Sequence, residues 1–222
     1  MPVLDAMIAS RLPDFPTLDI ERALWANGAL WVAGIDEAGR GALAGPVAAA
    51  AAILPQIKLF TQELHGVRDS KKMTANQRES WSTVIRATAV TFGVGLASAQ
   101  EIDTLGILPA TKLAAHRAIE QLSVVPDHLM IDHFRLSELP IPQTSITKGD
   151  VISLSIAAAS ILAKTTRDAL LRDLDKKYPG YGFAHHKGYG TAAHQDTIKT
   201  LGATPIHRMS FAPLKTYTMV KE

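Results

Sequence analysis

Residues 29–54 read ALWVAGIDEAGRGALAGPVAAAAAIL and contain the pattern that decides the fold. An apolar run with β-strand character, Ala29–Asp36, ends abruptly in two adjacent acids. A glycine-rich turn at residues 38–41 follows, and then a second apolar run, Val47–Leu54. Two such runs on either side of glycines predict an antiparallel pair of strands.

The rest of the chain alternates the signals of helices and strands. Thr74 and Gln77 form a capping-box pair that predicts a helix to about Ala87. Asp150 stands where a helix N-cap is expected and opens a long predicted helix to about Lys177. The other predicted elements are strands at 89–97, 128–131 and 140–147 and helices at 109–122 and 191–201. This order predicts an α/β fold, a central sheet with a helical C-terminal extension.

Composition excludes several classes of protein. The 222 residues are 47% hydrophobic and 20% charged, which is typical of a globular chain and excludes disorder throughout. The absence of cysteine excludes disulfides, cysteine nucleophiles and thiolate metal sites. No segment has the roughly 18 to 20 apolar residues of a membrane-spanning helix, and the N-terminus does not resemble a signal peptide. We therefore expect a cytoplasmic protein that does not contact membranes, and by default a monomer.

The charge is distributed unevenly along the chain. The formal net charge is only +2, but residues 164–222 hold 10 Lys and Arg against 5 Asp and Glu. A basic C-terminal quarter on a slightly acidic body suits a polyanionic partner, and a plain solvated surface explains it equally well.

Four acids are candidate catalytic residues because they stand at or just beyond the ends of predicted elements: Asp36, Glu37, Asp132 and Asp150. Converging carboxylates repel one another and raise each other's pKa unless cations neutralise them. An oxygen-only cluster suits Mg²⁺ or Mn²⁺. Two such ions about 3.5–4 Å apart suit phosphodiester cleavage. The alternatives are a solvated acidic turn for the first pair and a helix cap for Asp150.

The glycine turn allows two interpretations. Residues 39–44 match the G-x-G-x-x-A fingerprint of a dinucleotide-binding fold, but that fold requires a helix next, and a β-type run follows here. Close backbone approach to a ligand, with Arg40 near a phosphate, is the better interpretation.

Two further segments carry polar chemistry. In the loop HHKGYGT, Tyr189 can stack on a base or sugar, with a packed loop or a zinc site of His185, His186 and His194 as alternatives. Ser160 and Lys164 stand four residues apart, as in a Ser–Lys hydrolase. A phosphate-facing lysine, or an i,i+4 ion pair of Lys164 with Asp168, explains that spacing better.

Six segments together resemble, in order, the bacterial type 2 ribonucleases H (ribonuclease HII). They are GIDEAGRGALAGPV (34–47), DSKKM (69–73), the strand end Ile131-Asp132, KGDVISLSIAAASILAKTTRD (148–168), YPGYGFAHHKGYGT (178–191) and HRMSFAPL (207–214). The resemblance extends from about Leu30 to Leu214, and six segments in order are highly specific. An arginine in the glycine turn and a short preceding segment favour type 2 over type 3 enzymes.

The resemblance implies a ribonuclease H-like fold, a five-stranded mixed sheet flanked by helices. It divides the chain into an N-terminal extension (1–28), a catalytic domain (29–178) and a C-terminal helical and loop extension (179–222) that contributes to substrate binding. It implies hydrolysis of the RNA strand of RNA–DNA hybrids and cutting 5′ of single ribonucleotides in duplex DNA, leaving 3′-hydroxyl and 5′-phosphate ends. It also implies two Mg²⁺ or Mn²⁺ ions.

The resemblance assigns roles to residues by motif. The catalytic and metal-binding acids are Asp36, Glu37, Asp132 and Asp150, and the substrate contacts are Gly39, Arg40, Gly41, Lys72, Lys164 and Tyr189. The glycine turn senses the ribose 2′-hydroxyl, the tyrosine packs at the junction between the ribonucleotide and the next deoxynucleotide, and the two lysines contact phosphates. One departure lies beside the site, where His133 follows Asp132 and many relatives have glycine.

The runner-up functions use the same fold. A noncatalytic nucleic-acid-binding module has no reason to present four converging negative charges to a polyanion. A DNA nuclease would keep the metals and change the substrate, and only Arg40 in its turn and Tyr189 discriminate against it.

Overall fold

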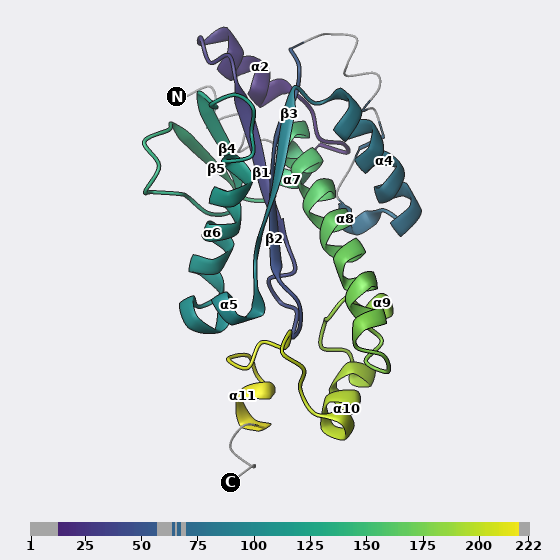
Figure 1. Cartoon of the computed structure of the whole chain (residues 1–222). Coiled ribbons are helices and arrows are strands. Elements are labelled where there is room, and N and C mark those ends of the chain that lie inside the picture. The colour runs from purple at the N-terminus through teal and green to yellow at the C-terminus, as the bar shows by residue number, and fades with distance from the viewer. Residues whose placement is uncertain (1–12, 57–63, 65, 68–69, 218–222) are drawn as a thin grey trace.

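The computed structural model describes residues 13–56, 64, 66–67 and 70–217. Its centre is a five-stranded sheet in the order β3-β2-β1-β4-β5 (Figure 1). The strands are β1 (Val32–Ala38), β2 (Val47–Ile53), β3 (Thr91–Ala97), β4 (His128–Asp132) and β5 (Gln143–Ile146). The first three strands pair antiparallel, whereas β4 runs parallel to both β1 and β5. The predicted five-stranded mixed sheet is confirmed.

Helices cover both faces of this sheet. The described helices are α2 (Asp19–Ala26), η1 (Ser70–Lys72), α4 (Ala75–Thr88), α5 (Ala99–Leu105), α6 (Ile107–Ile119), α7 (Gly149–Ile152), α8 (Leu154–Lys177), α9 (Phe183–His186), α10 (Ala192–Leu201) and α11 (Leu214–Tyr217). Figure 1 shows α4 and α8 on one side of the strands and α5 and α6 on the other. The C-terminal helices α10 and α11 lie beyond the turn that joins β1 to β2 (Figure 1).

The alanine-rich strand β2 separates two cores. Ala50 and Ala52 belong to the core under α4 and α8, whereas Ala49 and Ala51 face the core under α5 and α6. This alternation is the period-2 pattern of a strand buried on both faces. Small side chains allow helices to approach the sheet closely, and at Gly34 a Cβ would lie 2.1 Å from the backbone of Ser155 in α8. The start of α8 is thus packed directly against β1.

Most predicted elements are present, with shifted ends. The capping box of Thr74 and Gln77 opens α4 as predicted. The strand β1 begins at Val32 and continues two residues past Asp36, because β2 keeps pairing with it to Ala38. The helices α2 and α5 and the short helices η1, α9 and α11 were not predicted. A strand rather than a helix follows the glycine turn, so the dinucleotide-binding alternative is excluded.

Among the described helices, none is long and apolar enough to cross a membrane.

Candidate active site

The parallel pairing of β1 and β4 brings two of the four predicted acids, Asp36 and Asp132, close together. The last residue pair in this register is Ile35 with Ile131. One residue beyond it stand Asp36 and Asp132. Both follow buried apolar residues, and Asp36 itself is only 4% exposed. Two carboxylates from strands far apart in sequence therefore meet at one edge of the sheet.

Asp150 reaches the same edge from a short helix, and its predicted role as an N-cap is wrong. It lies inside α7, whose N-cap residue is Lys148 in the left-handed conformation. Ser153 then interrupts the helix with extended backbone angles, and its hydroxyl accepts from the amide of Ile156 to cap α8. The backbone amide of Gly149 donates to Asp132 Oδ1 over 2.8 Å. This bond ties the start of α7 to the end of β4.

Burial and mutual repulsion both act on these acids. Burial raises the pKa of Asp36 well above its ordinary value, and the negative charges of Glu37, Asp132 and Asp150 raise it further. Burial also raises the pKa of Glu37 and that of Asp132, with a contribution from a neighbouring acid in each case. Bound cations would relieve this repulsion between the acids.

Two basic side chains partly neutralise the cluster. Lys71 Nζ lies 3.1 Å from Asp150 Oδ2, and Arg40 Nη1 lies 3.1 Å from Glu37 Oε1. The other oxygen of Glu37, Oε2, is buried and has no hydrogen-bond partner among the residues that the structure describes. Lys71 was not among the predicted site residues, because exposed lysines are normally solvated.

The donor set fits a divalent cation by its chemistry. All four acids supply hard oxygen ligands, which Mg²⁺ and Mn²⁺ prefer, and the buried Glu37 Oε2 lacks a partner. Among the described residues, however, no three acidic or histidine side chains already surround a cation-sized space. The residues therefore fit a divalent cation by ligand type, although the described side chains do not already form a metal centre.

His133 occupies a backbone position that favours glycine. Its φ of 67° lies in the left-handed region, and its amide donates to the carbonyl oxygen of Ile146 over 3.2 Å. Histidine tolerates this region better than most residues do. The departure noted beside Asp132 is thus accommodated without moving that acid from the end of β4.

The glycine turn borders the acids. Gly39 has a φ of 89°, and a Cβ there would lie 2.0 Å from Arg167 Nε. Gly39 is therefore required both by backbone conformation and by the guanidinium packed beneath it. Gly41 has open space around it, as suits a residue that a ligand approaches.

Tyr189 lies across the cleft from the acids and is held by the same turn. Its backbone pairs with Ala42 in an isolated β-bridge. Its ring is 36% exposed and lies 5.6 Å from Lys164 Nζ and 5.4 Å from Arg167 Cζ. An exposed ring beside two cations is suited to stack on a nucleotide next to a phosphate.

One cleft of about 250 Å³ unites most of the predicted site. Its lining is Asp36, Glu37, Ala38, Gly39, Arg40, Gly41, Ser70, Lys71, Asp132, Ser160, Lys164 and Tyr189. Ser70 and Ser160, whose hydroxyl oxygens lie 2.9 Å apart, were not predicted as part of this cleft. Lys72 lies in η1, but its side chain is outside the described part of the chain.

The remaining alternatives from the sequence fail on geometry. Lys164 Nζ donates to Asp168 Oδ1 over 2.7 Å, so the i,i+4 pair replaces a Ser–Lys dyad with Ser160. The zinc site fails because His194 uses both ring nitrogens, one facing the carbonyl of Tyr189 and the other the ring of His207.

Comparisons with known proteins identify the family of the chain. The Ribonuclease HII family profile matches residues 33–214. Ribonuclease HII of Acetivibrio thermocellus is 54% identical over 191 residues, which cover 86% of this chain and 73% of the relative. That of Dehalococcoides mccartyi is 49% identical over 195 residues, 88% of this chain and 92% of the relative.

A solved structure gives the same result for the fold. The ribonuclease H2 of Pyrococcus horikoshii superposes with a TM-score of 0.69 at 26% identity, covering 84% of this chain and 96% of that one. The predicted resemblance is confirmed: the chain belongs to the ribonuclease HII family, whose members are metal-dependent endoribonucleases that cleave RNA in RNA–DNA hybrids.

Proposed function

We propose that this enzyme cuts duplex DNA on the 5′ side of single embedded ribonucleotides, in addition to the RNA strand of hybrids, and leaves 3′-hydroxyl and 5′-phosphate ends. The observation that carries the proposal is the cleft lined by Asp36, Glu37 and Asp132 together with the turn Gly39–Gly41 and Tyr189. Asp150 lies outside this lining. A cleft that only cut hybrids would not need a ring beside the turn.

Asp36, Glu37, Asp132 and Asp150 are the proposed ligands of two Mg²⁺ or Mn²⁺ ions. When bound, such ions supply Lewis acidity that activates water and stabilises the leaving oxygen. The chain supplies four carboxylates from three elements, with Asp132 fixed by the amide of Gly149. Burial and mutual repulsion raise the pKa of Asp36, Glu37 and Asp132, and a bound cation would relieve the repulsion among the acids.

The turn Gly39–Gly41 is the proposed sensor of the 2′-hydroxyl. Within the described residues, the backbone amides of Arg40 and Gly41 donate no hydrogen bond to another part of the chain. Free amides beside open space can donate to a ribose hydroxyl, the one group that distinguishes RNA from DNA at a single position. The side chain of Arg40 then stands near a phosphate, as do Lys164 and Lys72 in this proposal.

We propose different roles for two regions of the chain. We assign the metal ligands to the catalytic domain (29–178) and the junction contact to the C-terminal extension (179–222). The backbone bridges between Ala42 and Tyr189 and between Ala44 and His207 join these two regions at the cleft.

The first test compares three end-labelled duplexes with Mg²⁺, Mn²⁺ or chelator: all-DNA, an RNA–DNA hybrid, and DNA with one ribonucleotide. We expect metal-dependent cutting of the hybrid and cutting 5′ of the lone ribonucleotide, with all-DNA intact. Cutting of the hybrid alone would contradict the single-ribonucleotide activity. Cutting of all-DNA would favour a DNA nuclease, and binding of every duplex without cutting would favour a noncatalytic module.

A second test isolates Tyr189. Replacing Tyr189→Ala removes the exposed ring, and base or sugar stacking contributes about 1–3 kcal/mol, so cutting at the lone ribonucleotide should fall roughly 5- to 100-fold. Cutting of the hybrid, which has no RNA–DNA junction at most positions, should fall less. The matched control is Tyr178→Ala, a half-buried tyrosine outside the cleft. Equal losses on both duplexes would refute the junction role.

A further inference from the structure

The C-terminal segment 206–208 crosses directly beneath the two recognition elements of the cleft. The amide of Arg208 donates to the carbonyl of Leu43 over 2.8 Å, and the amide of Gly45 donates to Ile206. The amide of Leu43 in turn donates to the carbonyl of Gly188, next to Tyr189. Three separate stretches of chain thus form one small hydrogen-bonded unit under the glycine turn and the tyrosine.

We propose that His207 and Arg208 are specificity-determining positioning residues, Arg208 for the turn Gly39–Gly41 and His207 for Tyr189. The inference rests on the proposed function, because it assigns the control of that site's ribonucleotide selectivity. Neither side chain lines the cleft, so both act through the groups they hold.

Arg208 holds the turn by its carbonyl oxygens. Nη2 donates to Gly39 O and Nη1 to Arg40 O, each over 2.7 Å, and Nε donates to Gly45 O over 3.0 Å. The side chain is fully buried. Burial and the neighbouring Arg167 lower the pKa of Arg208 to about 9. Because the guanidinium is planar and its donors have a fixed geometry, the three hydrogen bonds hold the three carbonyl groups in place together.

Fixing the carbonyls determines where the amides point. A peptide group is planar, so holding Gly39 O and Arg40 O inward turns the amides of the following residues, Arg40 and Gly41, away from Arg208. These are the amides without a partner among the described residues. Arg208 therefore presents them to the ligand in one orientation.

His207 acts on Tyr189 through His194. The amide of Thr204 donates to His207 Nδ1 over 2.8 Å, so the neutral ring carries its proton on Nε2. That Nε2 lies 3.1 Å from His194 Nε2, which must accept, and His194 Nδ1–H then donates to the carbonyl of Tyr189 over 2.9 Å. Burial lowers the pKa of each ring to about 4, so both are neutral at physiological pH. Each donor in this series of hydrogen bonds is therefore determined, from Thr204 through His207 and His194 to Tyr189. The series holds the backbone that carries the ring of Tyr189.

The segment is anchored on its far side by α5. Asp103 accepts from the amide of Met209 over 2.8 Å, and from the amide and hydroxyl of Ser210 over 2.9 and 2.6 Å. Asp103 lies outside the cleft lining. Replacing Asp103 would remove these hydrogen bonds and weaken the attachment of the segment, without altering a group that faces substrate.

The test is the replacement Arg208→Lys, which keeps the charge but cannot bond three carbonyls. We measure kcat/KM on the single-ribonucleotide duplex and on the hybrid, and report their ratio. The ratio should fall at least 10-fold. A lone ribonucleotide can be cut at only one position along the duplex, whereas a hybrid presents ribonucleotides to the turn at many positions. Asp103→Ala should lower the ratio about 3-fold and serves if Arg208→Lys does not fold. The matched control is Arg117→Lys, whose Nη1 also donates to a backbone carbonyl, Leu96 O; its ratio should not change.

Hydrogen exchange gives a readout that does not depend on cleavage. In Arg208→Lys the amides of Ala42 and Leu43, which donate to Gly39 and Gly188, should exchange at least 10-fold faster than in the wild type. A core variant such as Leu129→Ala, matched in melting temperature, controls for loss of stability. If Arg208→Lys lowers kcat/KM equally on both duplexes, as that core variant does, Arg208 is only a structural residue and the proposal is overturned. A wild type that spares the lone ribonucleotide would instead overturn the proposed function and the selectivity role with it, while exchange would still report whether Arg208 holds the turn.

Discussion

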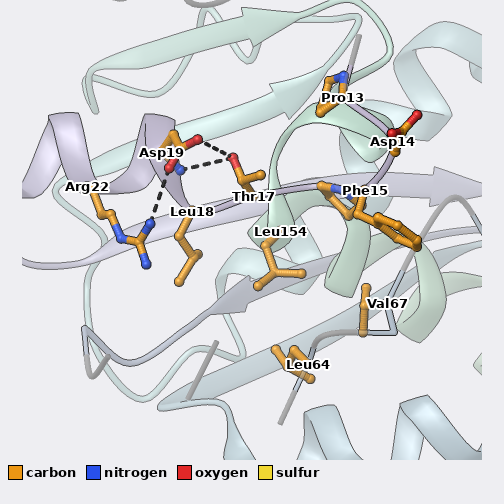
Figure 2. A pocket seen from close by; sticks show the side chains of 11 residues that line it. Pro13, Asp14, Phe15, Thr17, Leu18, Asp19, Arg22, Leu64, Val67 and Leu154 are labelled. Carbon is orange, nitrogen blue, oxygen red and sulfur yellow. Dashed lines mark hydrogen bonds and ion pairs between the residues drawn. The ribbon is translucent and has the colours of Figure 1, made fainter. Parts of the chain in front are cut away.

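Two of the clefts that border helix α8 differ in size and in lining, and the larger of the two lacks converging polar groups. The cleft of about 430 Å³ beside α2 is lined mainly by apolar side chains, among them Phe15, Leu18, Leu64 and Leu154. Figure 2 shows these side chains around the cleft, with the Asp19–Arg22 ion pair at its side. The cleft at the end of β1 is smaller, about 250 Å³, yet its polar groups converge. Convergence of titratable groups, more than volume, identifies a catalytic cleft.

The same contrast exists between two buried carboxyl groups. Glu21 of α2 is fully buried, and burial raises its pKa. It accepts from the hydroxyl of Ser153 over 2.6 Å and the amide of Ser155 over 3.0 Å, and no acid contributes to its shift. The pKa of Asp36 is raised by burial and by three other acids. A raised pKa alone therefore marks burial, and only the second pattern, in which several acids raise one another's pKa, is the one expected of the proposed cation site.

The largest expected effect is on kcat, and a matched pair of substitutions, one in each cleft, tests it. Asp36→Asn removes one proposed metal ligand and should lower kcat roughly 1000-fold or more, because the ions that it would help to hold activate water and stabilise the leaving oxygen. Duplex binding should persist, because the change removes negative charge near a polyanion. Asp14→Asn, at the apolar cleft, should leave kcat within twofold. Comparable activity of the two variants would break the contrast.

A smaller effect sharpens the contrast between the two carboxyl groups. Because the folded-state pKa of Glu21 lies above its unfolded value, the folded protein binds this proton more tightly. The stability it contributes is complete below about pH 4.5 and is lost as pH rises through the folded pKa, at up to about 1.4 kcal/mol per pH unit. Glu21→Gln removes this dependence, so the variant should gain in free energy of unfolding relative to the wild type as pH rises from 4 to 8.

Urea titrations at several pH values measure that difference. Glu120→Gln makes the same chemical change at an exposed glutamate that follows α6 and is the matched control. A difference between Glu21→Gln and the wild type that does not change with pH would mean that burial does not raise the pKa of Glu21. Activity of Glu21→Gln should stay near that of the wild type at pH 7, since Glu21 contacts the residues that start α8 rather than the acids.

Local signals in the sequence predicted much of the architecture. Short apolar runs located the five strands, and Thr74 with Gln77 located the start of α4 because a capping box is a contact within one turn. The end of β1 was predicted two residues early, since pairing with β2 carries the strand past its acids. Asp150 was misread as an N-cap because cap and catalytic acids use the same residue type at helix starts.

The residues that hold the site were the hardest to predict. Arg167 and Arg208 are fully buried arginines, and nothing in a single sequence distinguishes them from exposed ones. Their partners are backbone carbonyls, which leave no complementary side chain to recognise. Lys71 and Ser160 were visible only once η1 and α8 were placed beside the strand ends.

The sequence by itself determined the strands, the oxygen-only acid set and the family, because hydrophobic period, residue type and ordered motifs are local properties of the chain. Only the tertiary structure decided that four acids from β1, β4 and α7 meet, and that His207 and Arg208 lie beneath the recognition elements. Those juxtapositions join residues up to 169 positions apart. They arise from strand pairing and burial across the whole domain, which no local pattern encodes.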